Sequence, residues 1–342
     1  MDVNQLVREN IRSLSSYSSA RSEFSADEGI FFDANENPFG KYKRYPDPNQ
    51  TVLKRKISDL KGVIEQDIFI GNGSDEVIDL LFRIFCTPGK DQIILFTPTY
   101  GMYQVSANIN DINIIDITLN KNFQIDLKRV IPYLNDATIK LLFVCSPNNP
   151  TGNGIDKKAI EFLLKNFNGI VVLDEAYIDF SSEVSWASKV EAYPNLVVLQ
   201  TLSKAWGLAG LRLGMAFSNS VIINFFNKVK PPYNISSANQ KIALEALKYP
   251  AAFQRKVKQI LNERERLREQ LQGLKMLKKI YPSECNFLLI EVTDADQIYA
   301  QLIERNLIVR NRSKQVKNCL RITVGTKEEN NILLNELKKI EE

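Results

Sequence analysis

Short apolar runs alternate with longer amphipathic ones between about residues 50 and 230, and this alternation is the strongest constraint on the fold. Seven runs predict strands: 67–70, 92–96, 112–117, 140–145, 169–173, 196–199 and 211–217. Several are apolar throughout, which is typical of strands covered by helices on both faces. Helical patterns such as 74–85 lie between them. The alternation predicts an α/β fold with a mixed, mostly parallel sheet sandwiched by helices.

The pattern changes after Pro231 and Pro232. A long helix is predicted over 236–273. It is followed by strands near 286–292, 307–309 and 320–324, a helix over 294–305 and a terminal helix from 327. The 342 residues are enough for two domains. We expect an irregular N-terminal arm with part of the small domain over 1–45, a large domain over 46–235, and a smaller α+β domain over 236–342 joined by the long helix.

Residue types exclude several functions. Lys and Arg total 44 against 40 Asp and Glu, a net charge of +4 without a concentrated basic stripe, so a nucleic-acid partner is not expected. Histidine is absent, which excludes Ser-His-Asp triads, Cys-His dyads and histidine-ligated zinc. Proton transfer therefore falls to Lys, Tyr, Asp, Glu or Cys.

The four cysteines and the lengths of the apolar stretches indicate the cellular compartment of the protein. Cys86, Cys145, Cys285 and Cys319 are far apart and form no C-x-x-C pair, so free thiols in a reducing compartment are expected and a metal site is not. No stretch reaches the roughly 18 apolar residues of a membrane span, and the N-terminus lacks a secretory h-region. A soluble, cytoplasmic protein is expected, with no membrane partner.

Polar residues follow several predicted strands, where sheets of this kind bind ligands. GNGSDE (71–76) opens a helix, with Ser74 as its expected N-cap; it predicts either a capped helix or an anion site. SPNNPTG (146–152) brings two amides to a strand end. Asp174 follows an apolar strand, where a carboxylate requires a partner unless it caps a helix.

The stretch TLSKAWGLAGLRLG (201–214) places Lys204 and Arg212 among apolar residues and glycines. An apolar pocket lowers the pKa of a lysine and makes its amine a nucleophile for a carbonyl. Pyridoxal phosphate is an aldehyde cofactor that requires such a lysine, an acid for its ring nitrogen and donors for its phosphate. Lys204, Asp174 and Arg212 fit these roles. The hydroxyls of Ser74, Thr201 and Ser203 are further candidate phosphate donors.

The motifs GNGSDE, PTYGMY, SPNNPTG, VVLDEAY and SKAWGLAGLRLG, in this order, resemble the fold-type I pyridoxal-phosphate aminotransferases. LVRENIRSLSSYSSAR, FDANENPFGKYKRYPDP and VRNRSKQVKNCLRITVGTKEEN resemble the histidinol-phosphate aminotransferase branch of that family. The resemblance covers essentially the whole chain. It implies the pyridoxal-phosphate-dependent transferase fold, a homodimer with active sites at the interface, and pyridoxal 5′-phosphate as cofactor.

The resemblance also implies roles for residues around the cofactor. Lys204 would bind its aldehyde and then carry a proton between the substrate α-carbon and the cofactor. Asp174 would keep the ring nitrogen protonated, while Tyr177 and Asn149 would hydrogen-bond the phenolic oxygen. Tyr100 would stack on the ring.

The cofactor phosphate would be held, by the same resemblance, by Arg212, Ser203 and the amides near Ser74 and Asp75. Tyr45 of the partner subunit would also reach it.

A second set of residues is implied for the substrate. Arg321 would grip a carboxylate with its planar fork, although on the sequence alone a surface charge at a strand edge stays open. Arg310 and Tyr17 would bind the phosphate of histidinol phosphate, with Asn35 nearby. The implied reaction is reversible transfer of the amino group from L-histidinol phosphate to 2-oxoglutarate, which gives imidazole-acetol phosphate and L-glutamate in histidine biosynthesis.

Three alternatives remain at this stage. An aromatic aminotransferase or a threonine-phosphate decarboxylase would use the same cofactor with another substrate. A regulator with an aminotransferase-like sensing domain would require a DNA-binding domain, for which the arm is too short and shows no helix-turn-helix pattern.

Overall fold

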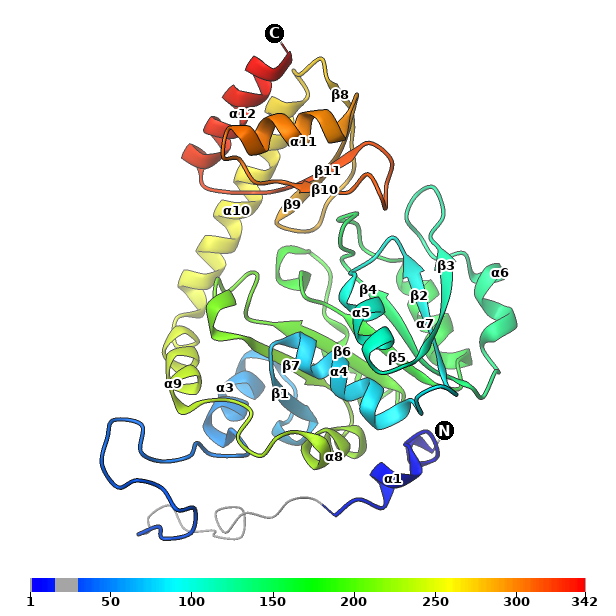
Figure 1. Ribbon diagram of the computed structural model, residues 1–342, viewed down its shortest axis with the longest axis vertical. Coiled ribbons are helices and arrows are strands. Elements are labelled where there is room, and N and C mark those ends of the chain that lie inside the picture. The colour runs from blue at the N-terminus through cyan, green and yellow to red at the C-terminus, as the bar shows by residue number, and fades with distance from the viewer. Residues whose placement is uncertain (1, 16–29, 342) are drawn as a thin grey trace.

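Two sheets organise the computed structural model, which describes residues 2–15 and 30–341 (Figure 1). The larger sheet has seven strands: β1 (Ile68–Asn72), β2 (Gln92–Thr97), β3 (Asn113–Thr118), β4 (Ile139–Cys145), β5 (Ile170–Asp174), β6 (Leu196–Thr201) and β7 (Leu213–Phe217). The smaller sheet has four: β8 (Leu277–Ile280), β9 (Phe287–Val292), β10 (Arg310–Asn311) and β11 (Cys319–Thr323).

Helices connect and cover these strands. Those before and within the large-sheet region are α1 (Glu9–Arg12), α3 (Thr51–Lys61), α4 (Ser74–Phe85), α5 (Met102–Ile109), α6 (Leu127–Val130), α7 (Lys157–Asn166) and α8 (Ser220–Val229). The later ones are α9 (Ser237–Ala246), α10 (Pro250–Leu271), α11 (Ala295–Glu304) and α12 (Lys327–Glu341). Among the described helices, none is long and apolar enough to cross a membrane.

The strand order in the large sheet is β1-β7-β6-β5-β4-β2-β3. β7 is antiparallel to both of its neighbours, and the other pairs are parallel, so the predicted mixed, mostly parallel sheet is confirmed. β1, β4, β5 and β6 consequently run in the same direction. Cys145 pairs with Asp174, and Thr201 pairs with Gly214. The loops that follow these four strands therefore leave from one edge of the sheet.

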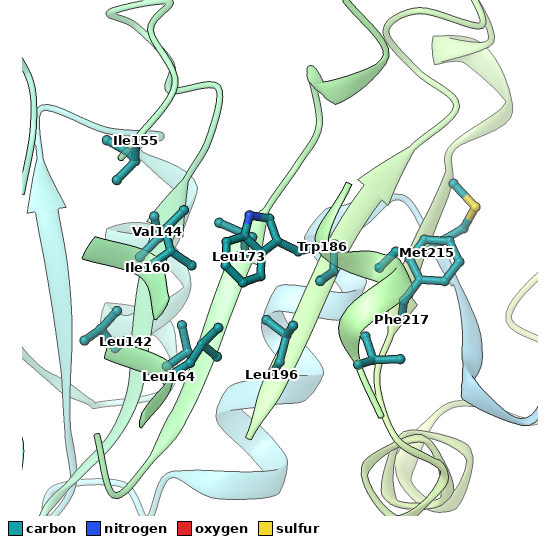
Figure 2. Close-up of a cluster of buried hydrophobic side chains, with 14 of the residues drawn as sticks. Leu142, Val144, Ile155, Ile160, Leu164, Leu173, Trp186, Leu196, Met215 and Phe217 are labelled. Carbon is teal, nitrogen blue, oxygen red and sulfur yellow. The ribbon is translucent and has the colours of Figure 1, made fainter. Parts of the chain in front are cut away.

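Apolar cores lie on both faces of this sheet because its central strands are apolar at alternate positions on each side. In β4, Leu142 and Val144 belong to one core and Leu141 and Phe143 to the other. Figure 2 shows part of the first core, where side chains from neighbouring strands meet Ile160 of α7 and other residues. Two-sided burial fixes the register of the strands and hence the position of their carboxyl-end loops.

The small sheet is antiparallel, in the order β10-β11-β9-β8. Its core includes Leu267 of α10, Leu288 of β9, Leu320 of β11 and Leu334 of α12. Figure 1 shows α10 rising from α9, beside the large sheet, to this second unit. The predicted smaller α+β unit is thus confirmed; the residue limits expected for the domains, at 45 and 235, stay predictions.

Three sequence predictions differ from the structure in this C-terminal part. The helix predicted over 236–273 is two helices, because Tyr249 is non-helical and Pro250 begins α10. The strand predicted at 307–309 lies instead at Arg310–Asn311. β8 was not among the predicted strands; it is an edge strand whose exposed positions are lysines, a composition that protects sheet edges.

The beginning of the arm is more ordered than expected. Residues 3–5 form a 3-10 turn before α1, and Val3 and Val7 are buried in the core that contains α4 and α8. The Arg8 backbone N–H donates to Ile84 O at 2.9 Å. The prediction of an irregular arm was therefore wrong for this segment, since its valines complete the core beside α8.

Candidate active site

A cavity of about 310 Å³ lies at the edge of the large sheet from which these loops leave, and residues of β10 and β11 in the small sheet also line it. Most of the predicted site residues line it: Ser74, Asp75, Tyr100, Asn149, Asp174, Tyr177, Thr201, Ser203, Lys204, Arg212, Arg310 and Arg321. Cys145, Ala176 and Arg312, which were not predicted, also line it. A larger hollow of about 680 Å³ between α3 and α9 contains none of the predicted residues.

One end of the cavity, here called the sheet end, consists of Ser74, Thr201, Ser203 and Arg212. The Thr201 hydroxyl donates to Leu213 O at 3.1 Å, and Ser203 N donates to Thr201 Oγ1 at 3.1 Å. These bonds hold the two hydroxyl residues at the end of β6. Arg212 Nη2 lies 3.2 Å from Asp75 Oδ2, which gives this end a paired positive charge.

The N-terminus of α4 also belongs to the sheet end. Gly73 is its N-cap, with φ +83°, and Ser74 is the first helical residue and caps nothing with its side chain. The prediction of Ser74 as the N-cap was therefore wrong: the left-handed glycine turns the chain one residue earlier. The Ser74 hydroxyl and the first N–H groups of α4 are left available to an anion.

Glycines bring the backbone unusually close at this end. A Cβ added to Gly73 would lie 2.6 Å from Arg212 Nη2, and one added to Gly214 would lie 2.2 Å from Ser74 N. Any side chain at either position would displace the arginine or the start of α4. The close approach of β7 to the helix N-terminus therefore depends on glycine.

Asp174 supplies a buried carboxylate on the cavity wall, at the end of β5. It accepts hydrogen bonds from the Tyr103 hydroxyl at 2.5 Å and from Ala176 N at 3.0 Å. Burial raises the pKa of Asp174, while these two hydrogen bonds lower it. Asp174 ends a strand, and the next helical turn, Ile178–Phe180, has Tyr177 as its N-cap, so Asp174 does not have the helix-capping role that the sequence left open.

Tyr103 is one of the residues in contact with the site that sequence reasoning missed. It lies in α5, is fully buried, and stacks on Phe143 with ring centroids 4.8 Å apart. Burial, followed by the charge of Asp174, raises its pKa well above the usual value, so it stays a neutral donor. It belongs to the PTYGMY motif, but the sequence does not show that a residue on a helix reaches the end of β5.

Lys204 lines the cavity, with Nζ 5.8 Å from the centroid of the Tyr177 ring, and is close enough to both Arg212 and Arg321 for their charges to act on its amine. The expected apolar pocket was wrong: the side chain is exposed within a cavity lined by hydroxyls, carboxylates and arginines. Partial burial lowers the pKa of Lys204, and the positive charge of Arg321 lowers it further. The amine therefore loses its proton more readily than an ordinary lysine.

The opposite end of the cavity, here called the arginine end, consists of Arg310, Arg312 and Arg321. Arg310 and Arg321 are cross-strand partners in β10 and β11. Arg312 follows Arg310 by two residues, and all three face the cavity. None of the three has an ion-pair partner among residues 2–15 and 30–341. Arg321 is therefore not the surface charge that the sequence left open.

Arg321 is connected to the loops of the large sheet. Its Nη1 donates to Asn149 Oδ1 at 2.5 Å, and its guanidinium carbon lies 5.2 Å from the centroid of the Phe287 ring. Tyr177 packs edge-on against the same ring, with centroids 5.3 Å apart. Arg321 Nε is buried and has no hydrogen-bond partner within the described part of the chain. Part of its fork is thus available to a ligand.

Two predicted residues, Tyr45 and Asn35, do not line the cavity. Tyr45 stacks on Tyr233, with centroids 4.5 Å apart, in a separate surface hollow that Asn35 also lines. In a single chain neither residue reaches Lys204. Tyr17 lies outside the described residues. The roles expected for these three residues stay predictions.

The donor set fits pyridoxal phosphate. The sheet end offers hydroxyls, an arginine and helix N–H groups to a phosphate, Asp174 offers a carboxylate to a ring nitrogen, and Lys204 offers an amine to an aldehyde. Tyr100 lies beside them, and its hydroxyl donates to Asp75 Oδ1 at 3.1 Å. Among the described residues no group of His, Cys, Asp or Glu has metal-binding geometry.

Comparison with known proteins decides the family. Residues 25–337 match the family described as aminotransferase class I and II. The chain belongs to this family. The predicted family and fold are thereby confirmed.

The relatives of this aminotransferase are similar over their whole length. A histidinol-phosphate aminotransferase of Parabacteroides distasonis is 49% identical over 342 residues, which cover 99% of each chain. The crystal structure of the histidinol-phosphate aminotransferase from Clostridium acetobutylicum matches with a TM-score of 0.81 at 23% identity, covering 88% of this chain and 91% of that one.

A third comparison includes the cofactor. The histidinol-phosphate aminotransferase of Sinorhizobium meliloti, in complex with pyridoxal-5′-phosphate, matches with a TM-score of 0.80 at 20% identity. It covers 90% of this chain and 89% of the other. At such identities, the two structural matches show the fold alone.

Proposed function

We propose that this aminotransferase catalyses the reversible transamination of L-histidinol phosphate with 2-oxoglutarate in histidine biosynthesis. The products are imidazole-acetol phosphate and L-glutamate, and the cofactor is pyridoxal 5′-phosphate. The observation that carries the proposal is one cavity with a separate anion-binding group at each end and Lys204 between them. The full-length relative with this activity in its name supports the choice of substrate.

Bound pyridoxal phosphate supplies an electrophilic aldehyde and an electron-accepting ring. The protein supplies position and proton transfer. The sheet end binds the cofactor phosphate, and the Asp174 carboxylate, held by Tyr103, favours a positive charge on the ring nitrogen. The Tyr177 hydroxyl and the Asn149 amide line the cavity where they would donate to the phenolic oxygen.

Lys204 is the proposed acid and base of the reaction. Its lowered pKa increases the fraction of neutral amine near pH 7, which is the form that removes a proton from the substrate α-carbon. Lys204 then donates this proton to the cofactor. Arg321 fixes the α-carbon beside this amine by binding the anionic group of the substrate, since its Nε has no hydrogen-bond partner among the described residues.

The proposed assembly is a cytoplasmic homodimer. Tyr45 and Asn35 line an exposed hollow away from their own cavity, so a second copy would be the means by which Tyr45 reaches a cofactor phosphate. The four cysteines are buried free thiols, which fits a reducing compartment.

Substrate choice tests the proposal against an aromatic aminotransferase. The purified protein with pyridoxal phosphate, L-histidinol phosphate and 2-oxoglutarate should form L-glutamate, measured by mass spectrometry. An Arg310→Gln variant should lower kcat/KM for L-histidinol phosphate by about tenfold or more while L-phenylalanine changes little, because a hydrogen bond to a charged group contributes about 1.5–3 kcal/mol. An equal loss with both substrates would remove Arg310 from the phosphate site, and turnover of L-phenylalanine alone would favour the aromatic alternative.

A further inference from the structure

The cavity contains two more arginines than the binding of a single carboxylate requires. Arg321 has a planar fork and Asn149 beside it, which is enough for one carboxylate. Arg310 and Arg312 add two guanidiniums on the same face of β10 and its following turn. A ligand with a second negative charge accounts for the surplus.

The main chain holds Arg312 in place firmly. Its N–H donates to Cys319 O at 2.8 Å, and its carbonyl oxygen accepts from Gln315 N and Val316 N, each at 2.8 Å. The neighbouring Asn311 is fixed on the other side by a hydrogen bond from Nδ2 to Asp296 Oδ1 at 2.5 Å. The turn therefore presents Arg312 to the cavity in a preset orientation.

The side chain of Arg312, in contrast, lacks a partner. Its Nε is buried and makes no hydrogen bond to any described residue. No carboxylate of the described chain lies within ion-pair distance of its guanidinium. Burial and the charges of Arg321 and Arg310 lower the pKa of Arg312 to about 10. A buried donor on a half-buried cation is costly unless a ligand satisfies it.

We propose that Arg312 is a specificity-determining residue that binds the phosphate monoester dianion of the substrate together with Arg310 and Arg321. This inference rests on the proposed function and extends it to a residue that the motifs did not single out. Arg312 contributes where the anionic group of the ligand is a dianion and little where that group is a singly charged carboxylate. It thereby favours phosphorylated over aromatic amino donors.

Steady-state kinetics of the holoenzyme test this assignment. Arg312→Gln should lower kcat/KM for L-histidinol phosphate by about tenfold or more, mainly through KM, and leave L-phenylalanine within about twofold. Arg312→Lys should lie between, because an ammonium keeps the charge without the fork. The matched control is Arg305→Gln, since Arg305 pairs with Glu336 at 3.3 Å and does not line the cavity; it should change neither substrate.

Phosphate binding provides a readout that does not depend on turnover. In the holoenzyme the cofactor occupies the sheet end, so inorganic phosphate titrated by calorimetry reports on the arginine end. Its Kd should rise about tenfold in Arg312→Gln and stay unchanged in Arg305→Gln. Thermal midpoints and cofactor absorbance of the variants show whether each one is folded and loaded.

The outcomes separate this proposal from the proposed function. If Arg312→Gln turned over L-histidinol phosphate as well as the unaltered protein does, the role of Arg312 would be overturned and the proposed function would stand. The same would follow from an equal loss with both amino donors, which indicates a structural role. If the unaltered protein does not use L-histidinol phosphate but binds inorganic phosphate through Arg312, the proposed function fails and the phosphate site stands.

Discussion

The cavity ends at the large sheet in hydroxyls, a helix N-terminus and an arginine paired with a carboxylate. At the small sheet it ends in three arginines that form no ion pair with a carboxylate of residues 2–15 and 30–341. The sheet end is built from loops fixed by a sheet buried on both faces. The arginine end lies on a short antiparallel pair of the small sheet. The difference fits the two tasks of the proposed function, in which one end would hold the cofactor and the other would bind substrates of different charge in turn.

The largest effect is expected at Lys204, which lies between the two ends. Lys204→Ala should lower the rate of the L-histidinol phosphate half-reaction by about 10²- to 10⁴-fold, because it removes the group that moves the α-carbon proton. Pyridoxal phosphate should still bind without a covalent bond, since the sheet end is intact. Stopped-flow absorbance measures both properties. A variant at near-normal rate would assign the proton transfer elsewhere; Lys189→Ala, at an exposed lysine, is the control.

A substitution at the arginine end should weaken the binding of both substrates without weakening the binding of the cofactor. Arg321→Lys keeps the charge but loses the fork, so KM for L-histidinol phosphate and for 2-oxoglutarate should each rise about tenfold to a hundredfold. The Kd of pyridoxal phosphate should stay unchanged, as measured by fluorescence titration of the cofactor-free protein. Weaker cofactor binding would show that the two ends are not independent.

The reciprocal result is expected at the sheet end. Arg212→Gln should raise the Kd of pyridoxal phosphate about tenfold, because a charged hydrogen-bond donor is lost and Asp75 loses its partner. With saturating cofactor, KM for L-histidinol phosphate should change little. The same fluorescence titration and steady-state assay measure both. If KM rose as much as Kd, the comparison between the ends would fail.

A change in stability, and not in ligand binding, is expected at the support behind the sheet end. Glu175 is buried beside Asp174, faces away from the cavity, and accepts hydrogen bonds from Trp186 N at 2.8 Å and Gln200 Nε2 at 2.9 Å. Burial raises its pKa to about 7, partly offset by hydrogen bonds. The folded state thus binds this proton more tightly than the unfolded state, so the stability it gives is full below about pH 4.5 and lost as the pH rises through 7.

This dependence of stability on pH predicts a measurable difference between the unaltered protein and Glu175→Gln. Between pH 5 and 8 the unaltered protein should lose about 2–3 kcal/mol of unfolding free energy relative to Glu175→Gln. Chemical denaturation at several pH values measures this. Glu183→Gln, at an exposed carboxylate paired with Lys157, is the control. A constant difference between the unaltered protein and Glu175→Gln would contradict the raised pKa and leave both ends of the cavity as described.

The sequence was informative where chemistry follows a strand directly. Asp174, Lys204 and Arg212 are each within a few residues of a buried strand, and the sheet register brings them to one edge. Tyr103 and Arg312 were missed for the opposite reason. Tyr103 reaches Asp174 from a helix, and Arg312 lies on a turn whose orientation depends on pairing with Cys319. No pattern in the neighbouring sequence predicts either contact.

Two helix boundaries were also predicted wrongly. Gly73 replaces Ser74 as the N-cap because its left-handed conformation turns the chain first, and Pro250 divides one expected helix into two. The apolar environment predicted for the Lys204 side chain was also wrong. Its neighbours along the chain are largely apolar, but its neighbours in space are polar. Residues distant in sequence decide that environment.

The most direct test of the account is the absorbance spectrum of the holoenzyme before and after L-histidinol phosphate is added without a keto acid. The account predicts that the visible band of the cofactor disappears as the amino group is transferred and returns when 2-oxoglutarate is added. Persistence of the band with L-histidinol phosphate, together with a response to L-phenylalanine, would contradict the substrate assignment. No visible band after addition of pyridoxal phosphate would contradict the role of Lys204 itself.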